Sequence, residues 1–435
     1  MACSLPALPA TARADTTLKN QVDQALAAIV ADKDQTLASL SVLVIKDGKP
    51  GYQQQFGYRY LDRQNPANNL PVDARTLYRV ASLSKMVATV GAMILVEQGK
   101  LDLDQDISHY LGFKLRNPHY PGVVITTRML LSHTSSLRDA AGYNFPPDVS
   151  MQNFLSSAGA QWADPARARS GEDYQPGKYF DYVNLNWGVL GTVMEAVSGQ
   201  RFDLLMQELV LKPLQVEGAY HPELLSDDEL GRLAVLYRKQ ENEVWNPQGP
   251  WHAQVDDFHS RPLARRAFDH YVPGTNASLF SPQGGLRISV QGLGRIMLML
   301  MNEGELDGLR LLQPATVRTL VSEQWRYDRA AHNGDDYHGL FQSWGLGVQR
   351  FSDVSAVHYG DRLVQPGMGQ AAFKAVGHLG FAYGLQSGFM FNPGTRNGMI
   401  YVIGGVAADP EKNPGQYSSL SIWEEKILTQ LYRFF

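Results

Sequence analysis

The chain has 435 residues, of which 44% are hydrophobic and 19% are charged, and its formal net charge is −4. A single hydrophobic core usually stops growing at roughly 250–300 residues, so we expect two domains. The weak negative charge gives no electrostatic reason to expect nucleic acid or an anionic membrane surface as a partner. No apolar run reaches the roughly 18 residues of a membrane span, so no integral membrane segment is predicted.

The first 16 residues are predicted to form a signal-like or disordered N-terminus. They contain Ala12-Arg13-Ala14, a small-x-small pattern typical of signal cleavage, without a basic start or a long apolar stretch. Cys3 is the only cysteine, which excludes disulfides, thiolate metal clusters and a catalytic cysteine in the folded body. We therefore expect a periplasmic or secreted protein. A disordered tail and a lipidation site at Cys3 are the alternatives.

The folded chain is predicted to open with a helix and a β-hairpin. Apolar residues recur at helical spacing over Leu18–Ala31. Leu40–Ile45 and Tyr52–Tyr58 have strand character, and Lys46-Asp47-Gly48-Lys49 between them is typical of a hairpin turn. We expect these elements to belong to an α/β domain.

Residues 86–279 are predicted to form a mainly helical domain. Helical spacing is found over Met86–Gln98, Thr127–Leu131 and Leu185–Val197, and glycine follows the first of these segments directly. Residues 220–276 differ, because they are polar, rich in Trp, His and Pro, and without a clear period. A segment of this length without a pattern is usually functional or disordered.

Strand character returns near the C-terminus, over Ala372–Gly377, Gly384–Asn392 and Met399–Val406. The amphipathic segment Ser421–Leu431 is predicted to be a helix that packs on this sheet. Strands at both ends of the chain predict one α/β domain, residues 17–85 and 280–435, with residues 86–279 inserted. The expected fold class is therefore α/β (α+β), an antiparallel sheet flanked by helices with an inserted all-helical domain.

The first chemical signal is a serine three residues before a lysine, in Ser82-Leu83-Ser84-Lys85. On a helix these two side chains share one face, so the Lys85 amine can lie against the Ser82 hydroxyl. A serine hydroxyl is a weak nucleophile unless a neighbouring group activates it. Because a chain of this length contains about one or two such matches by chance, the motif needs support from elsewhere.

Two further motifs follow in the order that a serine–lysine acyl-transfer enzyme needs. Tyr182-Val183-Asn184 supplies a second proton-transfer group, and His378-Leu379-Gly380 lies on a predicted strand. On that strand Gly380 would let a substrate backbone approach closely, and the N–H of Phe381 could point into a cleft.

With these motifs the chain resembles the serine β-lactamase and penicillin-binding protein superfamily, in its class C β-lactamase, DD-peptidase and esterase-like branch. Leu130-Leu131-Ser132-His133-Thr134-Ser135-Ser136-Leu137 and Pro282-Gln283-Gly284-Gly285 also resemble segments of that family. The resemblance extends over about residues 20–433. It implies a β-lactamase/transpeptidase-like fold and no metal or cofactor.

The resemblance also implies roles for individual residues. Ser82 would form the acyl-enzyme, while Lys85 and Tyr182 would share the proton transfers, with the Tyr182 pKa lowered by nearby cations. Asn184 would hydrogen-bond Lys85 or a substrate amide. The backbone N–H groups of Ser82 and Phe381 would form the oxyanion hole, and His378 would line the strand edge beside Gly380.

Two departures from the family pattern bear on the substrate. Leu379 and Phe381 replace the hydroxyl residues that commonly hold a carboxylate. This favours an apolar ester or amide as the substrate over penicillin and D-Ala-D-Ala peptides. Ser136 stands where the family usually has glycine, which we expect to alter a turn.

From the motifs and these departures we predict an esterase, an amidase or a D-amino-acid peptidase that acts on small-molecule esters, amides or peptides. The sequence leaves the oligomeric state open. The alternatives are a DD-carboxypeptidase, a class C-like β-lactamase, and a non-catalytic sensor.

Several of these residues also have ordinary structural interpretations. Tyr182 and Asn184 could simply cap the following helix, and His378 could be a hydrogen-bonded strand residue. His133 is expected to satisfy backbone groups near the cleft. The aromatic and histidine residues of the irregular segment either wall the substrate pocket or pack on each other at the surface: Trp245, Trp251, His252 and His259. The histidines show neither a His-Glu-x-x-His motif nor a tight cluster, so no metal site is predicted.

Overall fold

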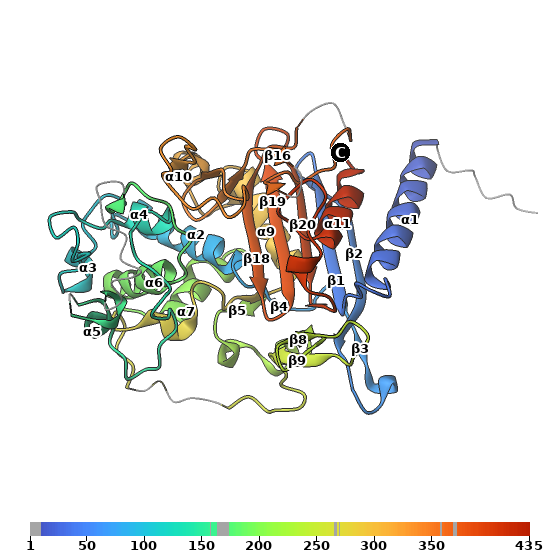
Figure 1. The fold of residues 1–435 in the computed structure, drawn as a ribbon, viewed down its shortest axis with the longest axis horizontal. Coiled ribbons are helices and arrows are strands. Elements are labelled where there is room, and N and C mark those ends of the chain that lie inside the picture. Colours follow the sequence, from blue (N-terminus) through green and yellow to red (C-terminus); the bar gives the residue numbers. More distant parts are fainter. Residues whose placement is uncertain are drawn as a thin grey trace, which may run out of the picture.

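The protein is built around a nine-stranded antiparallel sheet (Figure 1). This computed structural model describes residues 10–156, 158–162, 174–264, 268, 270–356, 359–368 and 372–435. The strands of the sheet, in spatial order, are β13 (Trp325–Arg326), β14 (Ser343–Trp344), β15 (Gln349–Phe351), β18 (Ala375–Ala382), β19 (Leu385–Asn392), β20 (Asn397–Ile403), β1 (Ser39–Lys46), β2 (Lys49–Tyr60) and β3 (Leu70–Pro71). N-terminal and C-terminal strands therefore share one sheet, as predicted, because β1 pairs with β20.

Alternate residues of the central strands are buried on the two faces of the sheet. Leu40, Val42 and Val44 of β1 face α1 (Ala10–Val30) and α11 (Ile422–Tyr432). Leu43 and Ile45 face the opposite way, into the core that contains α2 (Leu83–Glu97) and α9 (Val290–Met301). The sheet is thus buried on both sides, which explains why its strands are apolar almost throughout.

A second part of the molecule, drawn from cyan to green in Figure 1, is mainly helical. Its elements are α3 (Ser108–Leu111), α4 (Thr127–Leu131), α5 (Met151–Leu155), α6 (Leu185–Ser198), α7 (Phe202–Met206), a π-helical turn (Gln207–Leu211) and α8 (Asp227–Gly231). The buried helix α2 joins the two parts, because it contacts β18 and β19 at one side and α6 at the other.

Short strands and one more helix complete the fold. They are β4 (Tyr78–Arg79), β5 (Gly218–Ala219), β6 (Leu236–Arg238), β7 (Gln240–Glu241), β8 (Val244–Trp245), β9 (His252–Val255), β10 (Arg287–Ile288), β11 (Glu305–Leu306), β12 (Leu309–Arg310), α10 (Pro314–Val321), β16 (Ser355–Ala356), β17 (Tyr359–Gly360) and β21 (Gly405–Val406). Among the described residues, none of the helices is long and apolar enough to cross a membrane.

The predicted irregular segment 220–276 differs most from expectation, because it contains α8 and the strands β6 to β9. β6 pairs in parallel with β21, which belongs to the C-terminal part of the chain. Strands this short leave no periodic pattern, and their partners lie far away in sequence, so local spacing could not predict them. At the N-terminus, α1 begins at Ala10, so the Ala12–Ala14 pattern lies inside a helix, while residues 1–9 are outside the described residues.

Candidate active site

Ser82 lies at the junction between β4 and α2, on the wall of a cavity. The preceding residue, Ala81, has a φ of 49°, in the left-handed region that alanine rarely adopts. This sharp change of direction ends β4 and starts α2 with Ser82 in its N-cap position. Backbone strain held at one residue beside a reactive group is a common feature of functional sites.

Lys85 is one helical turn further along α2, and its side chain is completely buried. Its Nζ lies 3.0 Å from Ser82 Oγ, 2.7 Å from Asn184 Oδ1 and 3.0 Å from the Gln283 carbonyl oxygen. Burial lowers the pKa of Lys85 to about 7, against a smaller opposing effect of the Asp139 charge. Near neutral pH a substantial fraction of Lys85 is therefore uncharged and able to accept the Ser82 proton.

Asn184 is held in place by Asp139, a residue that the sequence did not single out. Asp139 Oδ2 accepts hydrogen bonds from the backbone N–H and side-chain amide of Asn184, at 2.9 and 2.8 Å. Its other oxygen accepts the N–H of Leu185 at 2.9 Å, which places the carboxylate at the N-terminus of α6. The Asn184 amide is thereby oriented so that its oxygen faces Lys85.

Tyr182 comes from the other side of the cavity, and its side chain hydrogen-bonds Ser82. Lys85 Nζ is 5.0 Å from the centre of the Tyr182 ring. The expectation that nearby cations lower the Tyr182 pKa is not met: burial raises this pKa, and the hydrogen bond with Ser82 offsets the increase only in part. Tyr182 therefore enters the site as a neutral hydroxyl, able to donate and to accept a proton.

Two buried histidines flank Tyr182. His133 stacks on the Tyr182 ring at a centroid distance of 4.4 Å, and its Nδ1 accepts the Val183 N–H at 2.9 Å, so it satisfies a backbone group as predicted. His378 of β18 lies 6.1 Å from the same ring. Burial, aided by the charge of Lys85, lowers the His378 pKa to about 3, so this imidazole is neutral and adds no positive charge to the site.

The edge of β18 that faces Ser82 is open. β15 pairs only with residues 375–377, so His378 to Ala382 have β19 as their single strand partner among the described residues. At Gly380 a Cβ atom would meet the Val80 carbonyl oxygen at 2.8 Å and the Ser82 nitrogen at 3.3 Å. Only glycine allows β18 to come this close, and this approach places the strand edge beside the Ser82 N–H, as an oxyanion hole shared with the Phe381 N–H would need.

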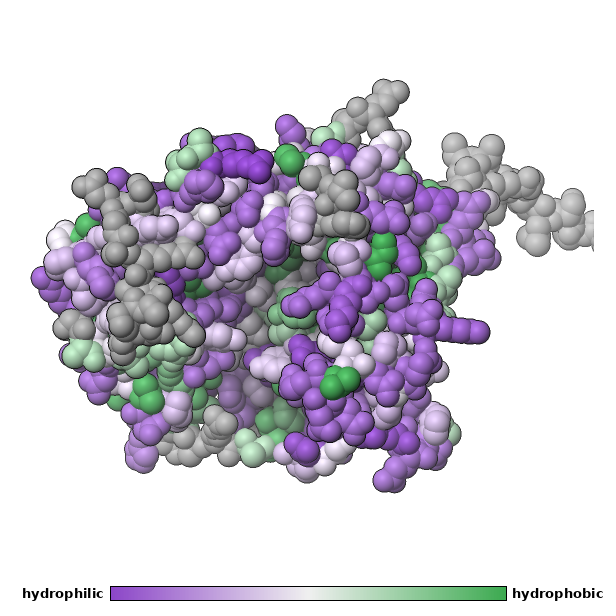
Figure 2. Space-filling view, in the orientation of Figure 1, coloured by the Kyte–Doolittle hydropathy of each residue, from purple (hydrophilic) through white to green (hydrophobic). Residues whose placement is uncertain are grey.

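The cavity that contains Ser82 has a volume of about 1000 Å³. Figure 2 shows the molecule hollowed near the centre of this face, where α2 and β18 meet in Figure 1. Most of the exposed aromatic side chains of the described chain line this cavity: Tyr143, Tyr337, Tyr359, Phe381 and Tyr383, with Tyr58 the exception. Aromatic rings left exposed around a cavity are typical of a binding site for a large, mainly apolar ligand.

The structure brings the predicted site residues together, since all of them except the buried Lys85 line this cavity: Ser82, Tyr182, Asn184, His378, Gly380 and Phe381. The aromatic and histidine residues of segment 220–276 do not line it. Trp245 lies beside Arg238, Trp251 beside Lys239, and His259 against Tyr60, so these side chains pack at the surface instead. In the described parts of the chain, His, Cys, Asp and Glu form no group of three that could hold a metal ion.

Asp139 and Arg79, which are not among the predicted site residues, also support or line the site. Gln283 lies in a segment that resembles the family, and its carbonyl accepts a hydrogen bond from Lys85 while its side chain donates to Asn144. The resemblance of this segment to the family could have indicated Gln283 as a site residue. No sequence pattern could have indicated Asp139, because it acts on a residue 45 positions away.

Comparison with known protein families shows which family this chain belongs to. The model of the family described as Beta-lactamase matches residues 19–417. The chain belongs to this β-lactamase family. It spans about two fifths of the length of the curated relatives that it matches, among them a β-lactamase of Providencia stuartii. That relative is 30% identical over 188 residues, which cover 43% of this chain and 44% of the relative.

Two solved structures share the fold of this chain. A D-amino acid amidase from Ochrobactrum anthropi SV3 in complex with L-phenylalanine amide has a TM-score of 0.64 at 16% identity, over 96% of this chain and 98% of that one. EstCE1, a hydrolase with promiscuous acyltransferase activity, has a TM-score of 0.60 at 19% identity, over 97% and 100%. The predicted β-lactamase/transpeptidase-like fold is therefore confirmed.

Proposed function

We propose that this member of the β-lactamase family is a serine hydrolase that cleaves esters or amides through an acyl-Ser82 intermediate. The observation that carries the proposal is the pair formed by Ser82 and Lys85. Their reacting atoms are 3.0 Å apart on the wall of an open cavity, and the pKa of Lys85 is lowered to about 7. A nucleophile within hydrogen-bond reach of an uncharged base is the arrangement that acyl transfer requires.

In the acylation step, neutral Lys85 takes the Ser82 proton while Oγ forms a bond to the substrate carbonyl carbon. The N–H groups of Ser82 and Phe381 would stabilise the resulting oxyanion, with each donor contributing on the order of 3 kcal/mol. When the tetrahedral species collapses, the bond to the leaving oxygen or nitrogen breaks. The Tyr182 hydroxyl, which hydrogen-bonds Ser82, protonates that leaving group and is reprotonated from Lys85.

Deacylation uses the same groups with water as the nucleophile. Neutral Lys85 accepts one proton from the water, relayed through the Tyr182 hydroxyl, as the water oxygen attacks the acyl carbon, and the bond from that carbon to Ser82 Oγ then breaks. Ser82 recovers its proton from Lys85. The neutral form of Lys85 is thus required at the start of both half-reactions.

The cavity supports a substrate with a bulky aromatic or apolar group. Aromatic side chains surround its mouth, while Leu379 and Phe381 occupy positions where hydroxyl groups would hold a penicillin-type carboxylate. The fold shared with a D-amino acid amidase and with EstCE1 agrees with amide and ester substrates. We therefore place esterase, amidase and D-amino-acid peptidase activity ahead of DD-carboxypeptidase activity, and both ahead of β-lactamase activity.

A fluorophosphonate probe tests the nucleophile. We expect the wild type to be labelled and Ser82→Ala to remain unlabelled, with Ser156→Ala of the helical part as a matched serine control. Equal labelling of wild type and Ser82→Ala would overturn the proposal. No labelling of the wild type, together with no turnover of any ester or amide, would instead indicate a non-catalytic binder.

A panel of substrates then separates the activities. p-Nitrophenyl esters of acetic and phenylacetic acid report esterase activity, D-phenylalanine p-nitroanilide reports aminopeptidase activity on D-residues, and nitrocefin reports β-lactam hydrolysis. We expect the phenylacetyl ester to be cleaved faster than the acetyl ester, because its acyl group carries a phenyl ring that can contact the aromatic walls. Nitrocefin turnover above that of the esters would reverse the proposed order.

Export to the periplasm or the medium is a separate proposal. The Ala12–Ala14 pattern and a sequence with one cysteine support it. Cell fractionation followed by N-terminal sequencing of the mature protein tests it, and a protein recovered only from the cytoplasm would contradict it.

A further inference from the structure

A cationic side chain lines the same cavity as Ser82. Arg79 belongs to β4, three residues before Ser82, and is partly exposed. Its Nε donates to the Gly284 carbonyl oxygen at 3.1 Å, and its guanidinium carbon lies 4.9 Å from the centre of the Tyr383 ring. These two contacts fix the plane of the guanidinium group at the wall of the cavity.

Arg79 differs from the arginine paired with it on the neighbouring strand. In β10, Arg287 is directly opposite Arg79, and its guanidinium group binds both oxygens of Asp256, at 3.0 and 2.7 Å. Arg79 forms no ion pair with any carboxylate of the described residues. A positive charge that is partly withdrawn from water and has no anion beside it attracts a negatively charged ligand, so this position favours an anion.

The two terminal nitrogens of Arg79 are the groups available to such a ligand. Neither has a hydrogen-bond acceptor in the described part of the protein, and neither is among the buried atoms that lack a partner, so both are accessible. The charges that act most strongly on Arg79 are those of Arg287, which repels it, and Asp256, which Arg287 already binds; Glu411 and Glu424 also line the cavity. The other neighbouring groups are the phenols of Tyr143 and Tyr383.

We propose that Arg79 binds a carboxylate group of the substrate whose ester or amide bond is presented to Ser82. This inference rests on the proposed hydrolase function and adds a substrate class to it, namely esters or amides that carry both a bulky aromatic or apolar group and a free carboxylate. The two terminal nitrogens of one planar guanidinium, each with a free N–H donor, match the two oxygens of a carboxylate.

Arg79 also changes the significance of Leu379 and Phe381. Their apolar side chains remove the hydroxyl groups that would hold a carboxylate on the β18 edge, but the cavity is not without an anion-binding group. The substrate carboxylate would instead be bound by Arg79 on the β4 side of the cavity, beside Tyr143 and Tyr383. A carboxylate bound by Arg79 lies in a different direction from Ser82 than a carboxylate bound on β18. The site therefore selects anionic substrates by where the carboxylate lies relative to the bond that is cleaved.

Equilibrium binding to a protein that cannot turn over tests the proposal independently of catalysis. The protein is Ser82→Ala, and the ligands are 3-phenylpropanoate and 3-phenylpropanamide, which differ only in the charged group. We expect calorimetry to show at least a ten-fold tighter binding of the carboxylate. In Ser82→Ala/Arg79→Gln this preference should disappear, and in Ser82→Ala/Arg79→Lys it should be retained in part, because lysine keeps the charge and loses the planar pair of donors.

The matched control is Ser82→Ala/Arg318→Gln, which removes an equal charge from an exposed arginine that is paired with Glu303. It should keep the full preference. The proposal is overturned if 3-phenylpropanoate binds no tighter than the amide, if neither ligand binds, or if Arg79→Gln leaves the preference unchanged in a protein that melts like its parent. A carboxylate preference in Ser82→Ala, combined with no fluorophosphonate labelling and no turnover of any ester or amide by the wild type, would support Arg79 and reject the hydrolase function.

Discussion

The chemistry of the site at the scale of single residues depends on how Lys85 is surrounded. Its amine has three oxygen neighbours, all of them neutral: the Ser82 hydroxyl, the Asn184 amide and the Gln283 carbonyl. The charge that acts on it is that of Asp139, which makes no direct contact with the amine and hydrogen-bonds the intervening Asn184. A buried amine with dipoles but no counter-ion loses its proton more easily than an exposed lysine does.

The first prediction is that activity rises with pH as Lys85 loses its proton. A base must be neutral to accept the Ser82 proton, and the Lys85 pKa lies at about 7, so kcat/KM should rise about ten-fold per pH unit below this value and level off above it. Measurement of kcat/KM for p-nitrophenyl phenylacetate from pH 5 to pH 9 checks it. A flat profile over that range would exclude Lys85 as the titrating base.

Asp139→Asn provides the control for this assignment. The Asp139 charge raises the Lys85 pKa, so its removal should move the midpoint of the pH profile to a lower value. Lys85→Arg should be inactive throughout, because arginine stays protonated. A midpoint unchanged in Asp139→Asn would show that another group controls the profile.

The sequence predicted the residues that meet at the cavity, but not Asp139 and Arg79, which support or line it. Ser82, Lys85, Tyr182 and His378 follow a spacing that a motif describes. Asp139 acts on a residue 45 positions away, and Arg79, although it lies only three residues before Ser82, belongs to none of the motifs. The direction of the Tyr182 pKa change was also missed, because burial between His133, Phe341 and Trp344 is a property of packing.

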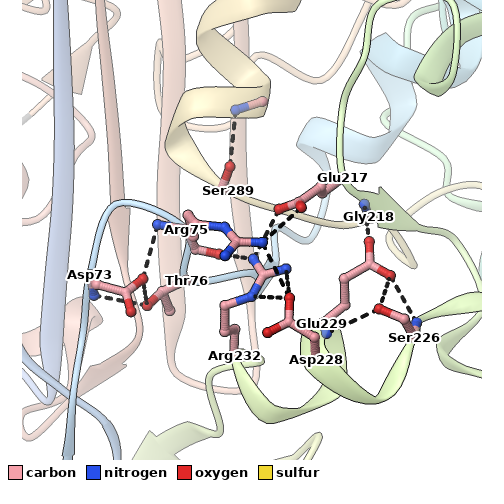
Figure 3. A network of polar contacts seen from close by, with 11 residues as sticks. Asp73, Arg75, Thr76, Glu217, Gly218, Ser226, Asp228, Glu229, Arg232 and Ser289 are labelled. Atoms are coloured by element: carbon pink, nitrogen blue, oxygen red, sulfur yellow. Dashed lines mark hydrogen bonds and ion pairs between the residues drawn. The ribbon is translucent and has the colours of Figure 1, made fainter.

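At the scale of elements, the position of Ser82 depends on how β4 is held. The segment before β4 is tied to α8 and to the strand β5 by a network of charged groups (Figure 3). Arg232 donates to Asp228, Glu217 and the Arg75 carbonyl, at 2.8, 3.0 and 2.9 Å. Arg75 donates to the same two carboxylates from the solvent side. The network therefore joins the chain that leads into Ser82 to segment 217–232.

The second prediction compares these two arginines. Arg232 is 9% exposed, and Arg232→Met should lower the free energy of unfolding by about 2 kcal/mol, because a backbone carbonyl and two carboxylates lose their shared donor. Arg75 is 54% exposed, and Arg75→Met should unfold at nearly the wild-type urea concentration. Urea denaturation followed by tryptophan fluorescence measures both. Equal losses in the two variants would contradict the importance of burial in this network.

Long elements could be predicted from the sequence, and short ones could not. Apolar spacing indicated α2, α6, the β1–β2 hairpin and the strands β18 to β20, since each is long enough for its pattern to repeat. The strands β6 to β9 are two to four residues long, and their positions are set by partners such as β21. The departure at Ser136 became clear only in the structure, because its φ of 68° explains why the family usually has glycine at that position.

At the scale of the whole molecule, stability depends on acids that folding removes from water. Glu195 of α6 is completely buried and accepts hydrogen bonds from the Phe202 N–H, the Tyr271 hydroxyl and the Gly274 N–H, at 2.8, 2.6 and 2.8 Å. These contacts attach the start of α7 and the loop 271–274 to the centre of the helical part. Burial raises the Glu195 pKa from 4.5 to about 7, although the three hydrogen bonds act in the opposite direction.

The third prediction follows from this change in pKa. A carboxyl group whose pKa is higher in the folded state stabilises the fold fully below pH 4.5, and this contribution is lost as pH rises through about 7. The difference in unfolding free energy between wild type and Glu195→Gln should therefore be larger at pH 5 than at pH 8, by about 3 kcal/mol. Other titrating groups are common to both proteins and cancel in this difference.

Urea denaturation at pH 5 and pH 8 measures the difference in unfolding free energy. The variant Glu208→Gln, at an exposed position, is the control for the chemical change. An equal difference at both pH values would show that Glu195 is ionised in the folded protein throughout, and that its three donors outweigh its burial.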